Sequence, residues 1–549
     1  MKSAGLKGLR KLNKKLNENK ELARKIKKII NVKKYQVVCF FLDVLLTISL
    51  VILSFCLKNI IDCISNGESI TTNNIIMIIV AFIFYFLSYY FGPILYKHLY
   101  ANAEKRLNFY VFETTVKQNQ EFFVKYDQGY IETIIEDVTS EVSDHYASFT
   151  IKFLCDFLTV VCYFAIMFYY SWQLTIVTII ILVIVMLLTS RVVNKQAEIV
   201  KDCKTGQSKF RTSILETMEN VNLIKMIDKT DYYTKEYKNI YSNSFYKPYL
   251  KYRVLGAIYT TLYAVILFIM PLFILIIGLV LKDVFMISLG SSISIYSLLG
   301  NLQEPIRDLS ALTSEKKQNS ENVKLLKDFM SFDLNPNMKR IDNFDSLEFK
   351  SSGIKFDNNE ILKNVSFNIE KNDFVLLRGA SGSGKSTIFK HIMKTDSNKA
   401  ITVMLNGNNI SEYNIYPDML LIQQKNNLFT TTIVDNIKCG YDATKEELEE
   451  VYNVCMLNDF INKYGELKEI DNISSNISGG EIQRICIARI LLRKPKVLLM
   501  DEITSALDSQ TTKNIAKNIY DFAKKYNITV IAISHKNEFD EYANKVIEL

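Results

Sequence analysis

Two stretches of this chain are too long and too apolar to belong to a soluble domain. Residues 157–190 and 255–281 contain no charged side chain. Each exceeds the roughly 20 residues that an α-helix needs to cross a lipid bilayer. Inside a bilayer, every backbone N–H and C=O group must be paired within the segment, so such runs are helical or form closed barrels. The sequence therefore excludes a purely soluble protein and predicts a helical membrane domain.

Further apolar runs bring the predicted number of spans to six. The break Tyr169-Tyr170-Ser171-Trp172-Gln173 divides residues 157–190 and predicts a tight hairpin between two helices. The last span is weaker because Gly290, Gly300 and Pro305 interrupt it. Membrane helices tolerate these residues where neighbouring helices or a water-lined cavity satisfy the backbone. We predict spans at about 35–57, 75–96, 150–170, 173–190, 255–281 and 287–306.

The distribution of basic residues predicts the orientation. Residues 1–34 contain thirteen Lys and Arg against two acids, and segments 97–149 and 191–252 are also rich in Lys and Arg. Short basic segments beside a span stay cytoplasmic. We expect a multi-pass protein of the plasma or inner membrane with a cytoplasmic N-terminus. The first 34 residues are a solvated tail or a basic helix on the inner membrane surface, and the spans continue as helices into the cytosol.

Overall composition excludes several other classes. The chain is 49% hydrophobic with a net charge of +8. The basic leader alone contributes thirteen minus two, or eleven, so the rest is nearly neutral, and the charge does not indicate nucleic-acid binding. Nine scattered cysteines without a C-x-x-C pair indicate neither a disulfide framework nor a zinc site.

From about residue 345 the pattern changes to short apolar strands alternating with helices. Residues 374–378 are predicted to form a buried strand that leads into a GxxxxGK[ST] motif, followed by a helix. In this motif backbone N–H groups surround phosphate oxygens, the lysine reaches the β- and γ-phosphates, and the serine binds Mg²⁺. The predicted nucleotide-binding residues here are Gly379, Ser381, Gly382, Ser383, Gly384, Lys385, Ser386 and Thr387.

A second motif supplies carboxylates. Residues 497–500 are apolar and precede Asp501 and Glu502. A central strand would deliver these acids to the carboxyl edge of the sheet, where ligands bind in open α/β folds. We expect Asp501 to share a Mg²⁺ site with Ser386, and Glu502 to orient or polarise a water molecule.

Between these motifs lies Ile477-Ser478-Gly479-Gly480-Glu481, which opens a predicted helix and would form another anion-binding N-terminus. The segment resembles the LSGGQ signature of ATP-binding cassette (ABC) proteins, with Ile for Leu and Glu for Gln. The resemblance implies that Ser478, Gly479 and Gly480 contact nucleotide.

Other elements of that family follow in order. Gln424 resembles the Q-loop residue, which implies contact with the nucleotide and with Mg²⁺. Asp508 resembles the D-loop aspartate, and His535 the switch histidine. Phe356 lies about where the family keeps an aromatic that stacks on adenine, although a strand residue in the core is an alternative. The resemblance implies that Lys385, Glu502 and His535 are catalytic.

The resemblance covers nearly the whole chain. It implies a membrane α-helical bundle of six transmembrane helices, ABC exporter type, plus a C-terminal α/β P-loop nucleotide-binding domain. The expected parts are a basic segment, a membrane domain, a linker and a nucleotide-binding domain with a short C-terminus, at residues 1–34, 35–310, 311–344 and 345–549. Such a half-transporter uses ATP and Mg²⁺, and each complete site needs a second subunit. We expect a homodimer rather than a heterodimer, and no nucleic-acid partner.

The cargo is less constrained. A peptide, a lipid and an amphipathic drug all remain open, with a peptide or cationic amphiphile as the leading interpretation. Asp43 and Asp156 fall inside spans, where carboxylates are costly and often functional. They could line a substrate cavity, or they could be paired locally, Asp156 with Lys152 one helical turn away. An ATP-gated channel or a regulatory membrane protein on the same scaffold is the alternative function.

Overall fold

The computed structural model describes residues 20–549 apart from 119, 127, 286, 331–337, 357–358, 381, 397–399, 425–426, 471–476, 505–506 and 535–536. It divides into two compact units, each with its own hydrophobic core. The first unit contains residues up to Gln118 together with Tyr126–Phe332. The second contains Asn119–Lys125 and Asp333–Leu549.

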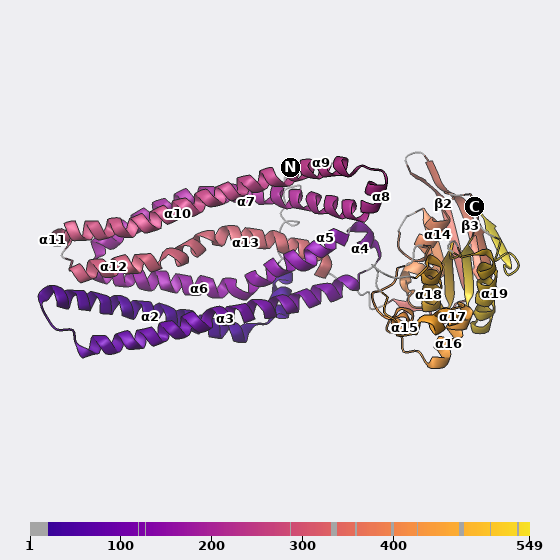
Figure 1. Cartoon of the computed structure of the whole chain (residues 1–549), viewed down its shortest axis with the longest axis horizontal. Coiled ribbons are helices and arrows are strands. Elements are labelled where there is room, and N and C mark those ends of the chain that lie inside the picture. Colours follow the sequence, from indigo (N-terminus) through magenta and orange to yellow (C-terminus); the bar gives the residue numbers. More distant parts are fainter. Residues whose placement is uncertain are drawn as a thin grey trace, which may run out of the picture. The chain divides into compact units, whose positions relative to one another are not determined.

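The first unit is helical throughout its regular structure, and its long helices run alongside one another (Figure 1). Residues 20–30 are helical, and two short π-helical turns, η1 (Ile134–Val138) and η2 (Tyr241–Tyr246), interrupt the long helices. The α-helices are α2 (Lys33–Asn66), α3 (Thr72–Val116), α5 (Gln128–Thr133), α6 (Thr139–Tyr170), α7 (Trp172–Glu219), α8 (Val221–Met226), α9 (Thr230–Ile240), α10 (Lys247–Val280), α11 (Lys282–Phe285), α12 (Leu289–Asn301) and α13 (Gln303–Met330).

Four described segments are long and apolar enough to cross a membrane, namely Lys33–Asn66, Thr72–Val116, Gln128–Tyr170 and Trp172–Val192. They contain the first four predicted spans. The fifth lies within α10, whose apolar part, Phe268–Val280, is shorter. The sixth is divided between α12, of 13 residues, and α13. Length and hydropathy therefore support four spans directly, and the count of six stays a prediction.

The predicted hairpin after the third span is confirmed. Helix α6 ends at Tyr170, and α7 begins at Trp172. Ser171 between them is extended, and its hydroxyl accepts a hydrogen bond from the backbone N–H of Leu174 at 3.4 Å. A serine at this position satisfies an N–H group that the first turn of a helix leaves unpaired.

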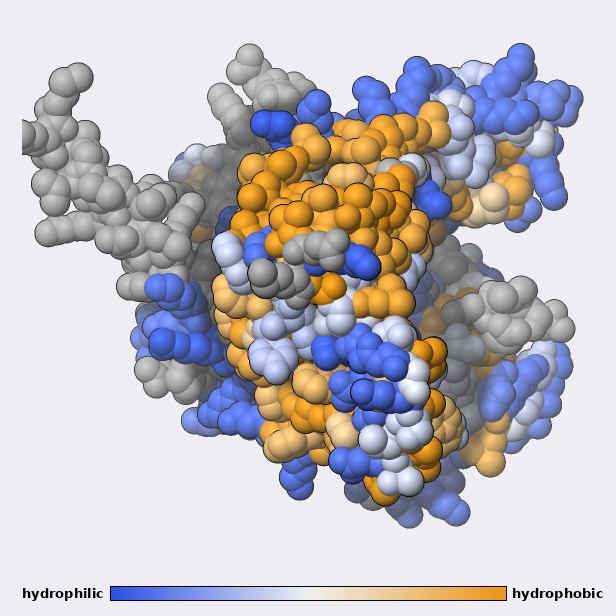
Figure 2. Space-filling model, turned by 90° about the vertical axis from the view of Figure 1, so that its left-hand side faces the viewer, coloured by the Kyte–Doolittle hydropathy of each residue, from blue (hydrophilic) through white to orange (hydrophobic). Residues whose placement is uncertain are grey.

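The helical unit carries large apolar side chains on its outer surface. Phe41 and Phe82 are 65% and 64% exposed. In Figure 2, hydrophobic residues form broad areas on the end of this unit that faces the viewer. Contiguous exposed apolar surface of this extent marks a membrane or interaction surface rather than a water-facing one. Polar contacts lie between the helices instead, as in the Thr47–Thr159 hydroxyl pair at 2.8 Å that joins α2 to α6.

The second unit contains a five-stranded parallel sheet of order β11-β4-β10-β9-β8 and an antiparallel sheet of order β3-β2-β5-β6, with a small β1-β7 pair. The strands are β1 (Lys339–Arg340), β2 (Ser346–Phe356), β3 (Asn359–Glu370), β4 (Phe374–Arg378), β5 (Ile401–Leu405), β6 (Asn408–Asn409), β7 (Tyr413–Asn414), β8 (Met419–Ile422), β9 (Val497–Asp501), β10 (Thr529–Ile533) and β11 (Lys545–Glu548).

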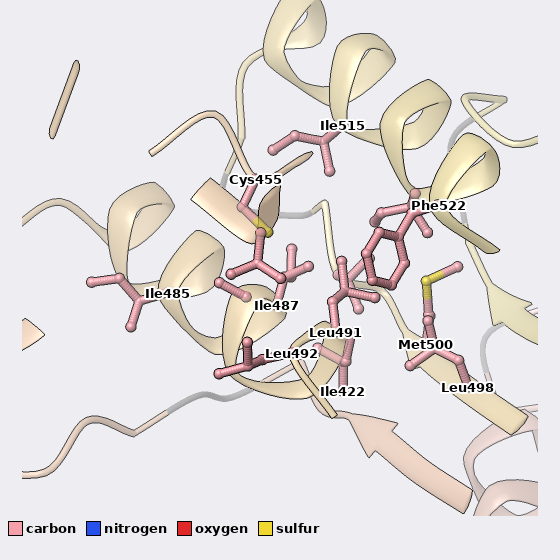
Figure 3. Close-up of a cluster of buried hydrophobic side chains, with 14 of the residues drawn as sticks. Ile422, Cys455, Ile485, Ile487, Leu491, Leu492, Leu498, Met500, Ile515 and Phe522 are labelled. Carbon is pink, nitrogen blue, oxygen red and sulfur yellow. The ribbon is translucent and has the colours of Figure 1, made fainter. Parts of the chain in front are cut away.

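The central strands β4, β9 and β10 of the parallel sheet are buried on both faces, which explains why they are almost continuously apolar. Successive residues of β9 alternate between two cores: Leu498 and Met500 join one, and Val497 and Leu499 join the other. Figure 3 shows the first core, where α18 and α19 cover the sheet. The helices of this unit are α4 (Gln120–Lys125), α14 (Lys385–Ile392), the 3₁₀ turn η3 (Ile410–Glu412), α15 (Ile433–Lys438), α16 (Lys445–Val454), α17 (Asn458–Tyr464), α18 (Gly479–Leu491) and α19 (Ser509–Tyr526).

Candidate active site

The predicted phosphate loop has the expected setting. It connects the carboxyl end of β4 to the start of α14. Gly384 caps that helix with φ of 92°, a left-handed conformation that suits glycine. At Gly379 a Cβ atom would lie 2.6 Å from the Ser383 hydroxyl and 2.9 Å from the Leu549 carbonyl oxygen. The loop is thus tightly closed, and its helix N-terminus favours an anion.

Lys385 lies inside this loop. Its Nζ donates to the carbonyl oxygens of Gly379 and Ala380, at 2.8 and 2.9 Å, and the residue is 7% exposed. A buried ammonium needs such acceptors. The loop therefore holds a positive charge beside the helix N-terminus, which is the arrangement that nucleotide phosphates require.

The predicted metal ligands Ser386 and Asp501 are brought together. The Ser386 hydroxyl lies at the start of α14 and 3.5 Å from Oδ2 of Asp501, the last residue of β9. A hydroxyl and a carboxylate oxygen suit Mg²⁺, which prefers oxygen ligands. The pair fits the ion that the phosphate loop is expected to use.

Glu502 has an unusual backbone conformation. Its φ is 48°, and its N–H donates to the Ile533 carbonyl oxygen at the end of β10, at 3.0 Å. Non-glycine residues held in this region are strained, and they cluster at functional sites. Two parallel strands therefore fix the backbone of the residue that carries the proposed catalytic carboxylate.

Gln424 follows β8 and contacts Glu502 rather than the Ser386–Asp501 pair. Its Nε2 donates to Oε2 of Glu502 at 2.9 Å. The resemblance anticipates Gln424 at the nucleotide and the metal, and both roles stay predictions. No feature of the sequence indicates its contact with Glu502.

The signature segment forms the N-terminus of α18. Ser478 is the N-cap, and its hydroxyl accepts from the Glu481 N–H at 3.3 Å. In return, Oε2 of Glu481 accepts from the backbone N–H of Ser478 at 2.7 Å and from its hydroxyl at 2.9 Å. Gly479 and Gly480 form the first turn. This reciprocal capping box orders the segment, and it ties the Ser478 hydroxyl to an acid.

Asp508 has a local structural role. It is the N-cap of α19, and its Oδ1 accepts from the N–H groups of Gln510 and Thr511, both at 3.0 Å. The Thr511 side chain and backbone, followed by the Gln510 N–H, lower the pKa of the Asp508 carboxyl. These hydrogen bonds give the Asp508 carboxylate a structural role that does not involve nucleotide. Its contact with nucleotide stays a prediction.

The remaining site residues are described to different extents. Ser381 and His535 lie outside the described residues. Phe356 ends β2, where its backbone pairs with Asn359. Thr387 lies in the first turn of α14, and its carbonyl oxygen is 2.9 Å from Nδ1 of His391. Gly382 and Ser383 complete the loop between β4 and α14.

Glu538 is a further residue of this region that the family motifs do not include. Its Oε1 accepts hydrogen bonds from the hydroxyls of Thr504 and Ser534, at 2.5 and 2.8 Å. Thr504 lies two residues after Glu502, and Ser534 follows β10. Glu538 therefore links the segments that follow the neighbouring strands β9 and β10. A useful signal was an acid three residues after the predicted switch histidine.

The two intramembrane acids have different surroundings. Oδ2 of Asp43 accepts from the Tyr96 hydroxyl at 2.5 Å, a contact between α2 and α3 that supports the local-pairing alternative. Asp156 instead lines a pocket between α6 and α13, together with Lys152 and Asp308. Asp43 is not among the residues that line this pocket.

Comparisons with known proteins agree with both halves of this architecture. Residues 37–306 match the family model for the ABC transporter transmembrane region, and residues 362–505 match the ABC transporter family model. The ATP-dependent lipid A-core flippase of Aliivibrio fischeri is 26% identical over 77% of this chain and 75% of its own length. Multidrug resistance protein 1 of Entamoeba histolytica is 36% identical over 36% of this chain but only 16% of its own length.

The fold agrees as well. A solved bacterial Atm1-family ABC exporter with ATP bound superimposes with a TM-score of 0.81 over 94% of both chains, at 19% identity. The two family models match consecutive parts of a single chain, and the predicted catalytic carboxylate, the predicted phosphate loop and the signature segment belong to the second part. The chain therefore belongs to the ABC transporters, as a half-transporter in which one membrane region is fused to one ATP-hydrolysing domain.

Proposed function

We propose that this protein exports a substrate across the membrane, driven by ATP hydrolysis in a dimer that alternates between inward- and outward-facing states. The observation that carries the proposal is the convergence of Lys385, Ser386 with Asp501, and Glu502 at the carboxyl edge of one parallel sheet. That sheet belongs to a chain that also has a membrane bundle. An intact hydrolytic site favours a pump over a purely regulatory scaffold.

A dimer follows from the number of motifs. One chain has one phosphate loop and one signature segment, and the family sandwiches ATP between the loop of one subunit and the signature of the other. Lys385 would hold the γ-phosphate from one side, and Ser478 of the partner subunit from the other. Since both motifs are present, two copies of this chain would build two equivalent sites, which favours a homodimer over a heterodimer.

Hydrolysis would be carried out by a small set of side chains. Glu502, held by the Ile533 carbonyl oxygen and by Gln424, would orient the attacking water. Lys385 and the helix N-terminus place positive charge where negative charge develops in the transition state. Mg²⁺, held by Ser386 and Asp501 with Gln424 as a further candidate ligand, would neutralise phosphate charge. ATP's preference for the closed dimer would shift the population of membrane states.

The site and the relatives constrain the class of substrate less than they constrain ATP hydrolysis. The relatives' names include a lipid A-core flippase and a multidrug resistance protein, so lipids and drugs both stay candidates beside peptides. A peptide or a hydrophobic cation is our leading proposal, because the helical unit has a strongly acidic pocket. The basic residues 1–34 and the basic loops support a plasma or inner membrane location, with the N-terminus and the ATPase domain in the cytosol.

Transport by the full chain in sealed proteoliposomes tests this proposal. We expect Glu502→Gln to bind ATP and dimerise but to release phosphate at least about 100-fold more slowly, as expected when an activating group is lost. Glu541→Gln, an exposed acid near the chain end, serves as the control and should keep wild-type turnover. ATP-dependent accumulation against a gradient identifies a pump. Dissipation of a gradient without accumulation would instead identify an ATP-gated channel.

Mixed dimers test the composite site. Combining a Lys385→Ala chain with a Ser478→Ala chain creates one intact site and one doubly defective site. We expect these dimers to hydrolyse ATP faster than either mutant homodimer. Equal activity in all three would overturn the proposed sandwich.

A further inference from the structure

Helices α6 and α13 of the helical unit enclose a pocket of about 440 Å³, closed on one side by Tyr100 of α3. The pocket is strongly acidic. Among the lining residues five carboxylates stand against one lysine, Lys152. Arg307, which is not a lining residue, pairs with Asp308 at 3.0 Å, so five minus two leaves an excess of three negative charges. The five acids are Glu141, Asp144, Asp156, Asp308 and Glu315.

The side chains around the pocket neutralise its carboxylates only in part. Oε2 of Glu141 accepts from the amide groups of Asn322 and Gln318, at 2.6 and 3.3 Å. Glu315 lies 2.9 Å from Nδ1 of His145. No lysine or arginine nitrogen in the described chain lies within 4.0 Å of a carboxylate oxygen of Asp144 or Asp156. The pocket therefore has more negative charge than its own cations neutralise.

Asn319 provides an independent indication of a ligand. It lines the same pocket and is 9% exposed. Among the described residues, none donates a hydrogen bond to its buried Oδ1. Buried polar atoms normally have a partner, and an amide oxygen can only accept. The Asn319 side chain also interacts with Tyr146, and a ligand with N–H or O–H donors would satisfy its Oδ1.

The spacing of the acids indicates an elongated ligand. Glu141 and Asp156 are fifteen positions apart on α6, which is about 22 Å along a helix. Asp308 and Glu315 are seven positions apart on α13, about 10 Å. No three acids, histidines or cysteines of the described chain converge as a metal site. The charges are thus arranged in a row rather than around one ion.

The walls of the pocket suit an organic cation. Tyr100, Phe149 and Phe153 contribute aromatic surface. Lys316 already places its ammonium 5.4 Å from the centre of the Phe149 ring, so this wall accepts a cation over an aromatic face. Apolar surface between charged groups matches alkyl segments between ammonium groups.

We propose that the α6–α13 pocket binds an elongated organic polycation, with ammonium or guanidinium groups spaced along an apolar chain. This inference rests on the proposed function, because it assigns the pocket to the transported substrate. The carboxylates pair with the charged groups of the ligand, and Asn319 Oδ1 accepts from one of its N–H donors.

Spermine is the probe for the test. Its binding to the full-length protein in nanodiscs is measured by titration calorimetry without nucleotide, in the Glu502→Gln background, so that the result does not depend on turnover. We expect Asp144→Asn and Asp308→Asn each to weaken binding about tenfold or more, as expected for removal of one partner of a desolvated charge pair. Asn319→Leu is expected to weaken it without a change of charge.

Glu113→Gln is the matched control, since it removes one exposed acid of α3 outside the pocket. It should leave spermine affinity within about twofold, which is the size of a surface charge effect. Unfolding temperatures confirm that each variant is folded. Absence of spermine binding to the wild type, or equal losses in Glu113→Gln and Asp144→Asn, would overturn the assignment. If binding follows the pocket variants but spermine is not transported with ATP, the pocket stands as a polycation site and its assignment to the transported substrate fails, whereas export itself is tested by ATP-dependent accumulation in proteoliposomes.

Discussion

The side-chain amide of Gln424 donates a 2.9 Å hydrogen bond to the carboxylate of Glu502. The two residues leave β8 and β9, neighbouring strands of the parallel sheet. The contact fixes one oxygen of the proposed catalytic acid, while the N–H of Glu502 is held by the Ile533 carbonyl oxygen of β10. Orientation of this acid therefore depends on three adjacent strands.

Substitution of Gln424 tests this relationship. Gln424→Glu would replace a donor with a second carboxylate beside Glu502. We expect ATP turnover to fall roughly tenfold or more, because a hydrogen bond to a charged group contributes roughly 1.5–3 kcal/mol. Gln423→Glu introduces the same charge at the exposed neighbouring position and should change turnover little. Equal turnover in both variants would show that the contact does not orient the acid.

The proximity of Ser386 and Asp501 predicts an altered metal requirement. Ser386→Ala and Asp501→Asn each remove an oxygen ligand from the proposed Mg²⁺ site. We expect the Mg²⁺ concentration for half-maximal ATPase activity to rise about tenfold or more, the usual size of effect at a metal site. Ser411→Ala, on the exposed η3 turn, is the control. Chelation by EDTA should abolish wild-type turnover, and an unchanged Mg²⁺ midpoint in Asp501→Asn would exclude its role.

The acid in the signature segment predicts a gain of affinity. The Ser478 hydroxyl donates to Glu481 at 2.9 Å, which places a negative charge beside the proposed γ-phosphate contact. Glu481→Gln can keep the capping box while removing that charge. In the Glu502→Gln background we expect ATP-driven dimerisation at a several-fold lower ATP concentration, measured by analytical ultracentrifugation.

Glu481→Ala provides the comparison. It removes both the charge and the cap, and loss of a cap costs about 1 kcal/mol of helix stability. We expect it to weaken dimerisation relative to Glu481→Gln. If Glu481→Gln and the parent dimerise at the same ATP concentration, the charge has no effect on the composite site.

A side chain added at Gly290 should disturb the packing of α12, whereas one added at Gly300 of the same helix should not. A Cβ atom at Gly290 would lie 2.3 Å from the Lys58 carbonyl oxygen and 2.6 Å from Oδ1 of Asp62, which accepts the Gly290 N–H at 3.0 Å. We expect Gly290→Ala to destabilise the helical unit by about 1–3 kcal/mol, as overpacking does.

Gly300→Ala is the matched control, because nothing lies within 4 Å of its Cβ position. Alanine is the better helix former by roughly 0.5–1 kcal/mol, so this variant should be equally or more stable. Thermal unfolding of the full chain in detergent compares the two. A Gly290→Ala protein as stable as Gly300→Ala would mean that α2 and α12 can separate without cost.

The contact between α16 and α19 predicts a pH dependence of stability. Glu450 accepts from Lys525 Nζ at 2.6 Å and from the Tyr526 hydroxyl at 2.7 Å. Burial raises the pKa of Glu450, but hydrogen bonds from Lys525 and Tyr526 and the nearby lysine charges outweigh it, so its pKa is lowered. A lowered pKa in the folded state stabilises the protein above the unfolded pKa, and this contribution disappears as pH falls through the folded pKa.

We therefore expect Glu450→Gln to unfold at a slightly lower temperature than wild type at pH 7. The difference should vanish once the pH is below the lowered folded pKa, which lies below the ordinary glutamate pKa of about 4.3. The effect is small because exposed ion pairs contribute little. Glu449→Gln, at the exposed neighbouring position of α16, should show no such dependence. A Glu450→Gln difference that persists at the lowest pH would assign the effect to packing.

Much of the fold was predictable because its signals are local. Apolar runs long enough to cross a bilayer predicted the four spans that the described helices contain, and the break at Ser171 predicted the hairpin between the third and the fourth. The glycines before Lys385 predicted the phosphate loop, since few other residues permit its backbone. Asp501 and Glu502 were predictable as the end of an apolar strand.

Several contacts of the site were not predictable from those signals. Gln424 meets Glu502, and Glu538 meets Thr504 and Ser534, only because strands far apart in sequence are neighbours in the sheet. Asp43 meets Tyr96 through the packing of α2 on α3. The periodicity of one helix does not specify which residue of another helix it faces.

The sequence by itself determined which segments are helices or strands, which ones favour lipid, and which residue types can bind phosphate. These properties depend on backbone conformation and on apolar surface within a few turns or one strand. Tertiary structure alone decided which polar groups from distant segments meet, and it formed the row of acids between α6 and α13. Such pairings depend on the order in which strands and helices pack, because the interaction between two charges depends on the distance between them in space and not on their separation in sequence.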